Sequence, residues 1–304
     1  MMRWKKLGRI YDPKGAEDWA LSHAANPVAE HLYGNKFQIY FSCRDSSNRG
    51  QIGSVKIEIS KTNVAVIQNS LNHVLSHGKL GRFDDSGVTV TGLVKQSNKK
   101  FLYYLGWNLG RTIPFRNAIG VAVCQNFDEQ FFRISEAPIV DRSSIDPISL
   151  SYPFLLYRGD RYCIWYGSCI EWFGESKTDY KFSLKYAESS DGILWHRTGE
   201  IALPCDYPSE SAIARPHVIF ENNIFKMWYS KKIGESYRIG YAESIDGRKW
   251  SRLDHRVGID VSETGWDSEM IEYPYVFDHL GSRYMLYNGN GYGKTGFGLA
   301  ILGH

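Results

Sequence analysis

The 304-residue sequence lacks several features that define common classes of protein. No apolar run approaches the roughly 18 residues that a membrane-spanning helix needs. The basic stretch MMRWKKLGRI at the N-terminus is not followed by the apolar segment of a secretory signal. Lys and Arg number 36 against 33 Asp and Glu, and a net charge of +3 is too balanced to indicate nucleic acid. We therefore expect no membrane span and no nucleic-acid partner.

Paired cysteines and metal-binding motifs are also missing. The sequence has five cysteines, an odd number without close-paired spacing, and neither His-Glu-x-x-His nor Cys-x-x-Cys occurs. No glycine-rich phosphate loop precedes a helix. Free thiols in a reducing compartment explain the cysteines most simply. We expect a cytoplasmic protein without a metal ion or cofactor.

No segment shows the sustained 3.6-residue periodicity of an amphipathic helix, but strand-like segments recur throughout. Residues 210–250 contain three apolar runs with strand-like alternation, at 217–220, 224–229 and 237–243. Turn-forming residues such as Asp246 and Gly247 close them. This pattern predicts a small antiparallel meander, which is stable only when copies pack face to face.

The meander repeats along the chain with a measurable spacing. A proline precedes a tyrosine by 13 residues in four places, and a fifth copy has Thr91 in the proline position. The four pairs are Pro27/Tyr40, Pro153/Tyr166, Pro216/Tyr229 and Pro274/Tyr287, and the fifth copy ends at Tyr104. Successive tyrosines are 64, 62, 63 and 58 residues apart, so the chain divides into five units.

Two units share a second motif, YAESSDGILW at 186–195 and YAESIDGRKW at 241–250. Asp-Gly between two strand-like runs is a strong hairpin signal, and the tryptophan after it suits packing between sheets. We interpret the motif as a structural turn without chemistry of its own.

Five sheet units without helices predict an all-β fold, a five-bladed β-propeller with four-stranded antiparallel blades around a central funnel. We expect one domain over residues 1–304, with 1–25 as an N-terminal extension or a closing strand. The predicted blades are 26–80, 84–140, 146–203, 210–258 and 266–304. The proline-bearing strand of each blade is expected to be innermost, so that residues next to these prolines line the funnel.

The order of proline, tyrosine and Ser-x-Asp-Gly-x-x-Trp resembles that of the five-bladed propellers of the arabinanase, levansucrase and invertase superfamily. Within it, the chain is similar to glycoside hydrolase families 43 and 130. The resemblance implies an Asp before the first-blade proline, an Asp on the second blade and a Glu two places before the third-blade proline. This sequence has Asn26, then Val90 or Thr89, and Ser151 at these positions.

Other acidic residues are candidates for a catalytic role. Unit five contains Asp267, Glu269 and Glu272, and Glu272 lies two places before Pro274. Strand alternation would point Glu269 and Glu272 to opposite faces. One of them could act as a general acid whose pKa is raised by burial among aromatic residues. Asp85 is a further candidate base, although its surroundings also suit an ordinary turn.

A second group of residues could bind the substrate. Arg215 and His217 flank Pro216, so alternation would place them on one face, where they could hold an anionic group. Alternatively, Arg215 pairs with Glu272 or Glu210 across neighbouring blades. The full set of predicted substrate-binding residues is Arg215, His217, Glu210, Asn26, His23, Arg44 and Trp107.

Together these features predict a carbohydrate-active enzyme that cleaves or transfers a glycosidic bond. The expected partner is a small or oligomeric carbohydrate inside the cell, including sugar phosphates, and the reaction could be that of a glycosidase, a phosphorylase or a transferase. The alternative is a propeller that binds or scaffolds glycans without catalysis. The residues Asn26 and Ser151 favour this alternative, because neither side chain can replace a catalytic carboxylate.

Overall fold

Strands form nearly all of the regular structure of the protein. The computed structural model describes residues 1–303 except 13–14, 16, 70–71, 126–129 and 175–178. In the described residues the strands are accompanied by a 3-10 turn at Asp254–Arg256 and a four-residue segment, α1 (Asn290–Gly293). No helix in this part of the chain is long and apolar enough to cross a membrane. The prediction of an all-β fold is therefore confirmed.

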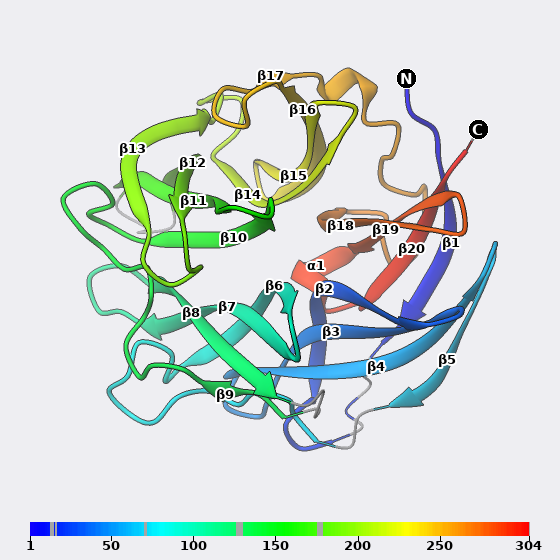
Figure 1. Ribbon diagram of the computed structural model, residues 1–304, viewed down its shortest axis with the longest axis horizontal. Helices are drawn as coiled ribbons and strands as arrows, with labels where there is room; N and C mark the ends of the chain where they lie inside the picture. The colour runs from blue at the N-terminus through cyan, green and yellow to red at the C-terminus, as the bar shows by residue number, and fades with distance from the viewer. Residues whose placement is uncertain (13–14, 16, 70–71, 126–129, 175–178, 304) are drawn as a thin grey trace.

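Consecutive strands pair antiparallel in groups around a common centre (Figure 1), and single parallel contacts join four of these groups in pairs into two eight-stranded sheets. One group is β2 (Ser22–Tyr33), β3 (Lys36–Arg44), β4 (Gly50–Ser60) and β5 (Asn63–Asn69). The next is β6 (Gly87–Gln96), β7 (Lys99–Leu109), β8 (Phe115–Gln125) and β9 (Phe132–Arg133). Then come β10 (Leu150–Tyr157), β11 (Tyr162–Phe173), β12 (Asp179–Ser189) and β13 (His196–Leu203). They are followed by β14 (Ala212–Glu221), β15 (Ile224–Ile233), β16 (Ser236–Ser244) and β17 (Ser251–Arg252).

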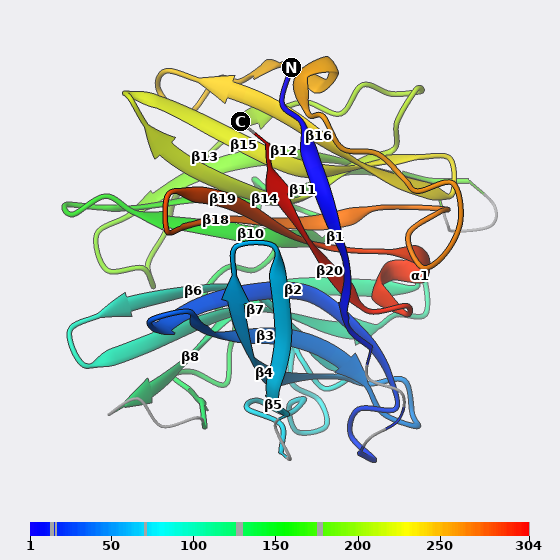
Figure 2. The same ribbon diagram turned by 90° about the vertical axis from the view of Figure 1, so that its right-hand side faces the viewer.

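The last group combines the two ends of the chain. It contains β18 (Glu272–His279), β19 (Ser282–Asn288), β20 (Phe297–Leu302) and β1 (Trp4–Tyr11). Strand β1 pairs antiparallel with β20, and Figure 2 shows the two strands side by side. The N-terminal segment thus adds the outer strand to a sheet that the C-terminal segment begins.

The first strand of each group, β2, β6, β10, β14 and β18, lies nearest the centre (Figure 1). Each of these strands is broken by a bulge at the repeat proline or, in β6, at Thr91. The residue before three of the prolines has a positive φ: 57° at Asn26, 51° at Arg215 and 57° at Tyr273. Side chains other than glycine rarely adopt this conformation, and such residues are concentrated at functional sites. The bulges turn these side chains toward the centre.

The repeat tyrosines are buried, and each lies against a carboxylate. Their hydroxyl groups donate hydrogen bonds from Tyr40 to Glu30 (2.8 Å), Tyr166 to Asp146 (3.0 Å), Tyr229 to Asp254 (2.6 Å) and Tyr287 to Asp267 (3.1 Å). Asp84 lies beside Tyr104, whose pKa is raised first by burial and then by this carboxylate, but the Tyr104 hydroxyl has no hydrogen-bond partner among the described residues. A Lys or Arg is paired with each carboxylate. The measured repeat therefore corresponds to a buried arrangement of tyrosine, carboxylate and cation.

The Ser-x-Asp-Gly motif forms a turn. The hydroxyl oxygen of Ser244 accepts hydrogen bonds from the backbone N–H groups of Asp246 and Gly247, and Asp246 Oδ1 accepts two more from the residues that follow. The indole N–H of Trp250 donates to the Gly247 carbonyl at 3.0 Å. The interpretation of this motif as a structural turn is confirmed.

Candidate functional site

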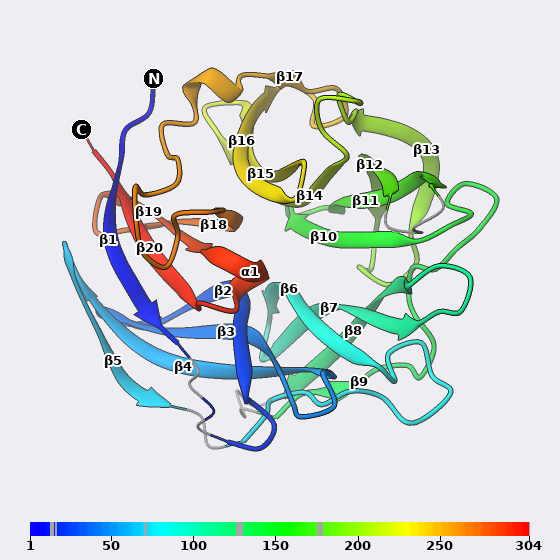
Figure 3. The same ribbon diagram turned by 180° about the vertical axis from the view of Figure 1, so that it is seen from behind.

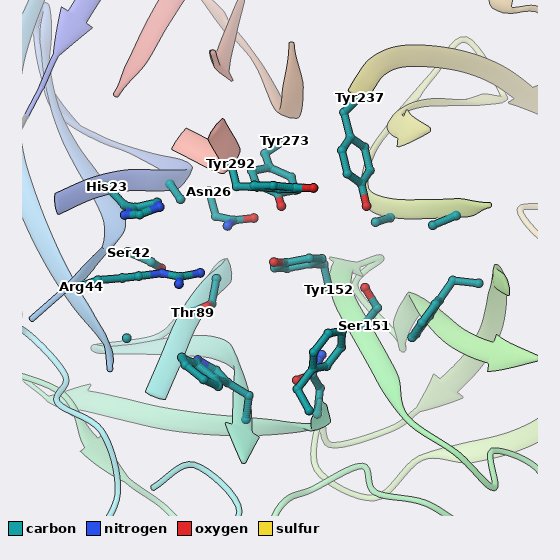
Figure 4. A pocket seen from close by; sticks show the side chains of 18 of the residues that line it. His23, Asn26, Ser42, Arg44, Thr89, Ser151, Tyr152, Tyr237, Tyr273 and Tyr292 are labelled. Carbon is teal, nitrogen blue, oxygen red and sulfur yellow. The ribbon is translucent and has the colours of Figure 1, made fainter. Parts of the chain in front are cut away.

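A cavity of about 320 Å³ lies at the centre, where the first strands of the groups converge (Figure 4). Viewed from behind, α1 lies beside β2 near the same centre (Figure 3). The cavity is lined by His23, Ala25, Asn26, Ser42, Cys43, Arg44, Gly50, Thr89, Trp107, Phe115, Asn117, Ser151, Tyr152, Tyr180, Phe182, Ala212, Ala214, Tyr237, Tyr273 and Tyr292. Its size falls within the range of small-molecule sites.

Tyrosines form much of one wall of the cavity. Tyr152 follows Ser151 on β10, Tyr237 lies on β16 and Tyr273 on β18, and Figure 4 shows all three extending into the same space. The ring centroids of Tyr152 and Tyr273 are 5.3 Å apart, and those of Tyr237 and Tyr292 are 6.0 Å apart. Burial raises the pKa of each hydroxyl, so these groups are neutral donors and acceptors at pH 7. Such a wall suits a ring that carries hydroxyl groups.

Glu272 lies behind this wall and does not line the cavity itself. Its side chain is fully buried, and neither carboxyl oxygen has a hydrogen-bond partner among the described residues. Burial raises its pKa well above the usual value, and the Tyr273 hydroxyl offsets the rise in part without reaching hydrogen-bond geometry. The carboxyl in turn raises the pKa of Tyr152, Tyr237 and Tyr273. Burial therefore favours the protonated form of Glu272, next to the tyrosines of the cavity.

The opposite side of the cavity carries nitrogen-containing side chains. His23 of β2 and Arg44 of β3 lie at one end of the cavity, and Asn26 of β2 lies between them and the tyrosines (Figure 4). The pKa of His23 is lowered to about 4, first by burial and then by the charges of Arg44 and Lys294. His23 is therefore neutral at pH 7. The unprotonated imidazole lies next to a permanent positive charge.

Trp107 closes this end of the cavity. Its indole packs on glycine backbone, because a Cβ at Gly50 would lie 3.2 Å from Nε1 and a Cβ at Gly87 would lie closer still. The guanidinium of Arg44 lies 5.9 Å from the Trp107 ring centroid. Trp107 thus packs against the neighbouring strands and also lines the cavity.

Three of the cavity residues occupy the positions at which the resemblance implies carboxylates. Asn26, Thr89 and Ser151 all line the cavity, but none of them is acidic. No Asp or Glu occurs among the described lining residues. The paired carboxylates of most glycoside hydrolases are therefore absent from the described wall.

Two predicted substrate-binding residues, Arg215 and His217, do not line the cavity. Arg215 is fully buried, and its guanidinium donates to the backbone carbonyl of Thr91 at 2.5 Å and to that of Pro27 at 3.5 Å. It pairs with neither Glu272 nor Glu210, which corrects the alternative prediction. The cation instead connects β14 to the first strands of two other groups.

His217 lies between sheets. Its ring is 4.5 Å from the ring centroids of both Phe154 and Tyr275, and burial lowers its pKa to about 3. The prediction that Arg215 and His217 share a face assumed regular alternation. The bulge at Arg215 and Pro216 interrupts that alternation, so a shared face no longer follows from it.

Two further predicted residues belong to ion pairs away from the cavity. Glu210 accepts hydrogen bonds from Arg252 at 2.5 and 2.8 Å. Asp267 accepts from Lys6 Nζ at 2.7 Å and from the Tyr287 hydroxyl. These contacts give both carboxylates a structural explanation, and their substrate-binding and catalytic roles stay predictions.

The remaining acidic candidates are also away from the cavity. Asp85 accepts hydrogen bonds from the Gly81 backbone and from Asn108 Nδ2, as a turn residue does, and its pKa is lowered. Glu269 is exposed, and its backbone accepts from Arg238. None of the predicted catalytic residues lines the cavity, although Glu272 directly precedes the lining residue Tyr273, and four predicted binding residues line it: Asn26, His23, Arg44 and Trp107.

The tyrosine wall was not predicted from the sequence. A signal was present, because Tyr152 and Tyr273 directly precede repeat prolines, as Asn26 does. Tyr180, Tyr237 and Tyr292 have no such marker. Among the described residues, no three His, Cys, Asp or Glu side chains are grouped so that they could hold a metal ion.

Comparisons with known proteins cover nearly the whole chain. No protein-family model matches it. It is 44% identical over 301 residues to the uncharacterized protein Rv1502 of Mycobacterium tuberculosis strain H37Rv, and equally to MT1551 of strain CDC 1551, with 99% of each chain covered. The fold also recurs in solved structures of low sequence identity.

Those structures are glycoside hydrolases. One solved glycoside hydrolase has a TM-score of 0.72 at 15% identity, and the match covers 98% of this chain and 90% of the other. A thermostable family-43 glycoside hydrolase has a TM-score of 0.66 at 15% identity, with coverages of 92% and 89%. An endo-arabinase from Bacteroides thetaiotaomicron has 0.63 at 11%, with coverages of 98% and 97%. The likeness shows that the chain shares the propeller fold of these proteins.

Proposed function

This chain belongs to the same family as Rv1502 of Mycobacterium tuberculosis, and we propose that it is a carbohydrate-active enzyme that cleaves or transfers a glycosidic bond. The substrate binds in the central cavity, between the tyrosine wall and the side chains of His23, Asn26 and Arg44. The likeness in fold to glycoside hydrolases supports this class of reaction.

We also propose that the fold is a single domain made of five four-stranded blades. Five bulged inner strands and five tyrosine–carboxylate contacts support this number. We further propose a cytoplasmic location and an intracellular sugar, sugar phosphate or glycan intermediate as substrate. The five cysteines support a reducing compartment, since all are buried and none forms a disulfide bond among the described residues.

One observation carries the catalytic proposal: Glu272 is a fully buried carboxyl group without a hydrogen-bond partner among the described residues. Burying an unpartnered polar group costs about 1–3 kcal/mol by mutational data, so the fold would be more stable without it. Strongly perturbed acids beside a cavity are candidates for catalysis. A carboxyl group that stays protonated near neutral pH is suited to donate a proton to a leaving group.

Tyr273 connects Glu272 to the substrate, because it is the next residue along β18 and lines the cavity. Its hydroxyl donates a proton to the departing glycosidic oxygen and takes the proton of Glu272. Tyr273 is then neutral before and after the step, and the carboxylate carries the resulting negative charge. Its hydroxyl is the group through which a buried acid can reach the substrate.

The nucleophile has to come from a second substrate and not from the protein. Hydrolysis by two carboxylates requires a second acid about 5–9.5 Å from the first, on the wall of the site. The described wall has Asn26, Thr89 and Ser151 instead. We therefore propose direct displacement, assisted by one acid, by a phosphate oxyanion or by an acceptor hydroxyl that releases its proton to solvent, and not hydrolysis by a carboxylate pair.

A second candidate function is glycan binding without catalysis. The neutral side chains of Asn26, Thr89 and Ser151 favour it, because they keep the shape of a sugar site without its usual acids. In this case Glu272 would contribute only to the polarity of the tyrosine wall.

The two functions are separated by a screen of sugar phosphates, nucleotide sugars and aryl glycosides with the wild-type protein, Glu272→Gln and Glu263→Gln. Glu263 is exposed in the loop before β18 and serves as the matched control. The enzyme proposal predicts turnover that falls by roughly 100-fold or more in Glu272→Gln and is unchanged in the control. Equal turnover in Glu272→Gln would remove Glu272 from the mechanism. Binding without turnover of any compound would support the second candidate.

A further inference from the structure

We propose that the sugar in the central cavity is anionic and that Arg44 binds its carboxylate or phosphate group. This inference rests on the proposed function, because it assumes that the cavity holds a sugar. It assigns the charge of the substrate and the residue that recognises it.

The positive charge of Arg44 is not paired with a carboxylate of any described residue. Its Nη1 donates to the amide oxygen of Asn48 at 2.8 Å, and its guanidinium lies near the Trp107 ring. Both partners are uncharged. The carboxylate next to it in sequence, Asp45, is paired with Arg49 at 2.9 Å and accepts backbone hydrogen bonds from Ser47 and Arg49. Arg44 is thus oriented by its neighbours but keeps an uncompensated charge.

Other groups at this end of the cavity add positive potential and no negative charge. Lys294 and Arg44 both lower the pKa of His23, so two cations lie near this imidazole. The described lining contains no carboxylate to oppose them. A low-dielectric cavity with charge of one sign attracts ligands of the opposite sign. An oxyanion placed at Arg44 would form charge-assisted hydrogen bonds.

A neighbouring group indicates that the ligand also carries hydroxyl groups. Asn26 is only 2% exposed, and its Oδ1 accepts no hydrogen bond from the described residues. Its backbone N–H is already bonded to Asn288 Oδ1 at 2.8 Å, which fixes the residue in place. Figure 4 shows Asn26 between the Arg44 end and the tyrosine wall. A sugar hydroxyl would satisfy Oδ1 while the ring lies against the tyrosines.

Two classes of sugar share this chemistry, namely sugar acids and sugar phosphates. The site has one guanidinium, a neutral histidine and a hydroxyl from Ser42, and either oxyanion can accept hydrogen bonds from a guanidinium. The test therefore includes both classes, each with its neutral parent sugar.

The experiment is a calorimetric titration of the full chain with a panel of common hexoses, their uronic acids and their 1-phosphates. The variants are Arg44→Gln, Arg44→Lys and Arg161→Gln, where Arg161 is half exposed on the hairpin between β10 and β11 and serves as the control. Thermal unfolding of each variant verifies that it is folded. We expect an anionic sugar to bind at least tenfold more tightly than its neutral parent. Arg44→Gln should weaken that binding by about ten- to hundredfold, Arg44→Lys should restore part of it, and Arg161→Gln should leave it unchanged.

Each other outcome overturns a different statement. If neutral and anionic sugars bind equally, or if folded Arg44→Gln binds as wild type does, the inference is wrong while the proposed function stands. If no sugar binds to the wild-type protein, the proposed function fails and the inference fails with it. A preference for uronic acids over phosphates, or the reverse, identifies which oxyanion Arg44 recognises.

Discussion

Asp267 accepts a hydrogen bond from the hydroxyl of Tyr287, which follows it by 20 residues, over 3.1 Å. The same spacing relates Asp146 to Tyr166 and Asp84 to Tyr104. In each case the carboxylate is also paired with a cation, which for Asp267 is Lys6 of β1. These carboxylates stabilise the repeat. The pair between Asp267 and Lys6 also connects the N-terminal strand β1 to the last sheet.

The first prediction is that Asp267→Asn lowers stability and leaves sugar binding unchanged. The substitution removes the carboxylate that pairs with Lys6 and leaves it only the Ser262 hydroxyl, so we expect the free energy of unfolding to fall by about 1–3 kcal/mol. Urea denaturation measures it. Asp260→Asn is the control, since Asp260 is 74% exposed and its pair with Arg238 should contribute less than about 1 kcal/mol. Loss of sugar binding by folded Asp267→Asn would instead show that Asp267 contributes to the binding site.

The second prediction concerns the buried cation Arg215. Lysine keeps the charge but cannot donate to the carbonyls of Thr91 and Pro27 with one planar group. We expect Arg215→Lys to lose about 2–3 kcal/mol in urea denaturation. The same change at the exposed Arg161 should have almost no effect. An unchanged midpoint for Arg215→Lys would show that this connection between inner strands contributes nothing.

Features of the fold that depend on contacts within one group of strands could be predicted from the sequence, whereas contacts between groups could not. The spacing of prolines and tyrosines is set within each group of strands, so it was visible in the sequence and marks the observed bulges and buried hydroxyls. The contacts of Arg215 join residues more than 100 positions apart, and no local pattern encodes them. Alternation also failed at the bulges, where a positive φ turns Arg215 and Tyr273 away from the faces that a regular strand would give them.

Part of the site could be predicted because some of its residues have fixed positions relative to the repeat prolines. Asn26 and Glu272 lie at fixed offsets from repeat prolines, and both adjoin the cavity. Tyr180 and Tyr237 reach the cavity from β12 and β16, which are not inner strands, so their position depends on strand length and packing. Asp84 and Asp85 differ by one residue, yet Asp84 is buried with Arg133 and Asp85 caps a turn.

The third prediction tests the protonation state of Glu272. Its folded-state pKa is raised, so the folded protein binds a proton more tightly than the unfolded chain, and this contribution to stability is lost as pH rises above about 4.5. Glu272→Gln does not titrate. The variant should therefore gain stability relative to wild type by up to about 1.4 kcal/mol per pH unit from pH 5 upward. Denaturation curves at pH 5, 6, 7 and 8 measure this difference, and a constant difference would contradict a raised pKa.

The fourth prediction applies to His217 and has the opposite sign. Its folded-state pKa is lowered to about 3, so the unfolded chain binds the proton more tightly, and stability is lost as pH falls below about 6.5. His217→Phe removes the titrating group from between Phe154 and Tyr275. We expect the stability gap between the variant and wild type to shift in favour of the variant by up to about 1.4 kcal/mol per pH unit below 6.5. Denaturation at pH 7.5, 6 and 5 tests this, and parallel curves would show that His217 does not resist protonation.

The central claim is that the cavity between the tyrosine wall and Arg44 binds a sugar. Thr89 is half-buried in its lining, so Thr89→Trp should fill the space, whereas Thr198→Trp places the same side chain on the exposed outer strand β13. The most direct measurement is the affinity of both variants and the wild type for the tightest sugar in the panel, with folding verified by thermal unfolding. We expect the affinity of folded Thr89→Trp for the sugar to fall by at least tenfold and that of Thr198→Trp to equal the wild-type affinity. Undiminished binding by folded Thr89→Trp would contradict it.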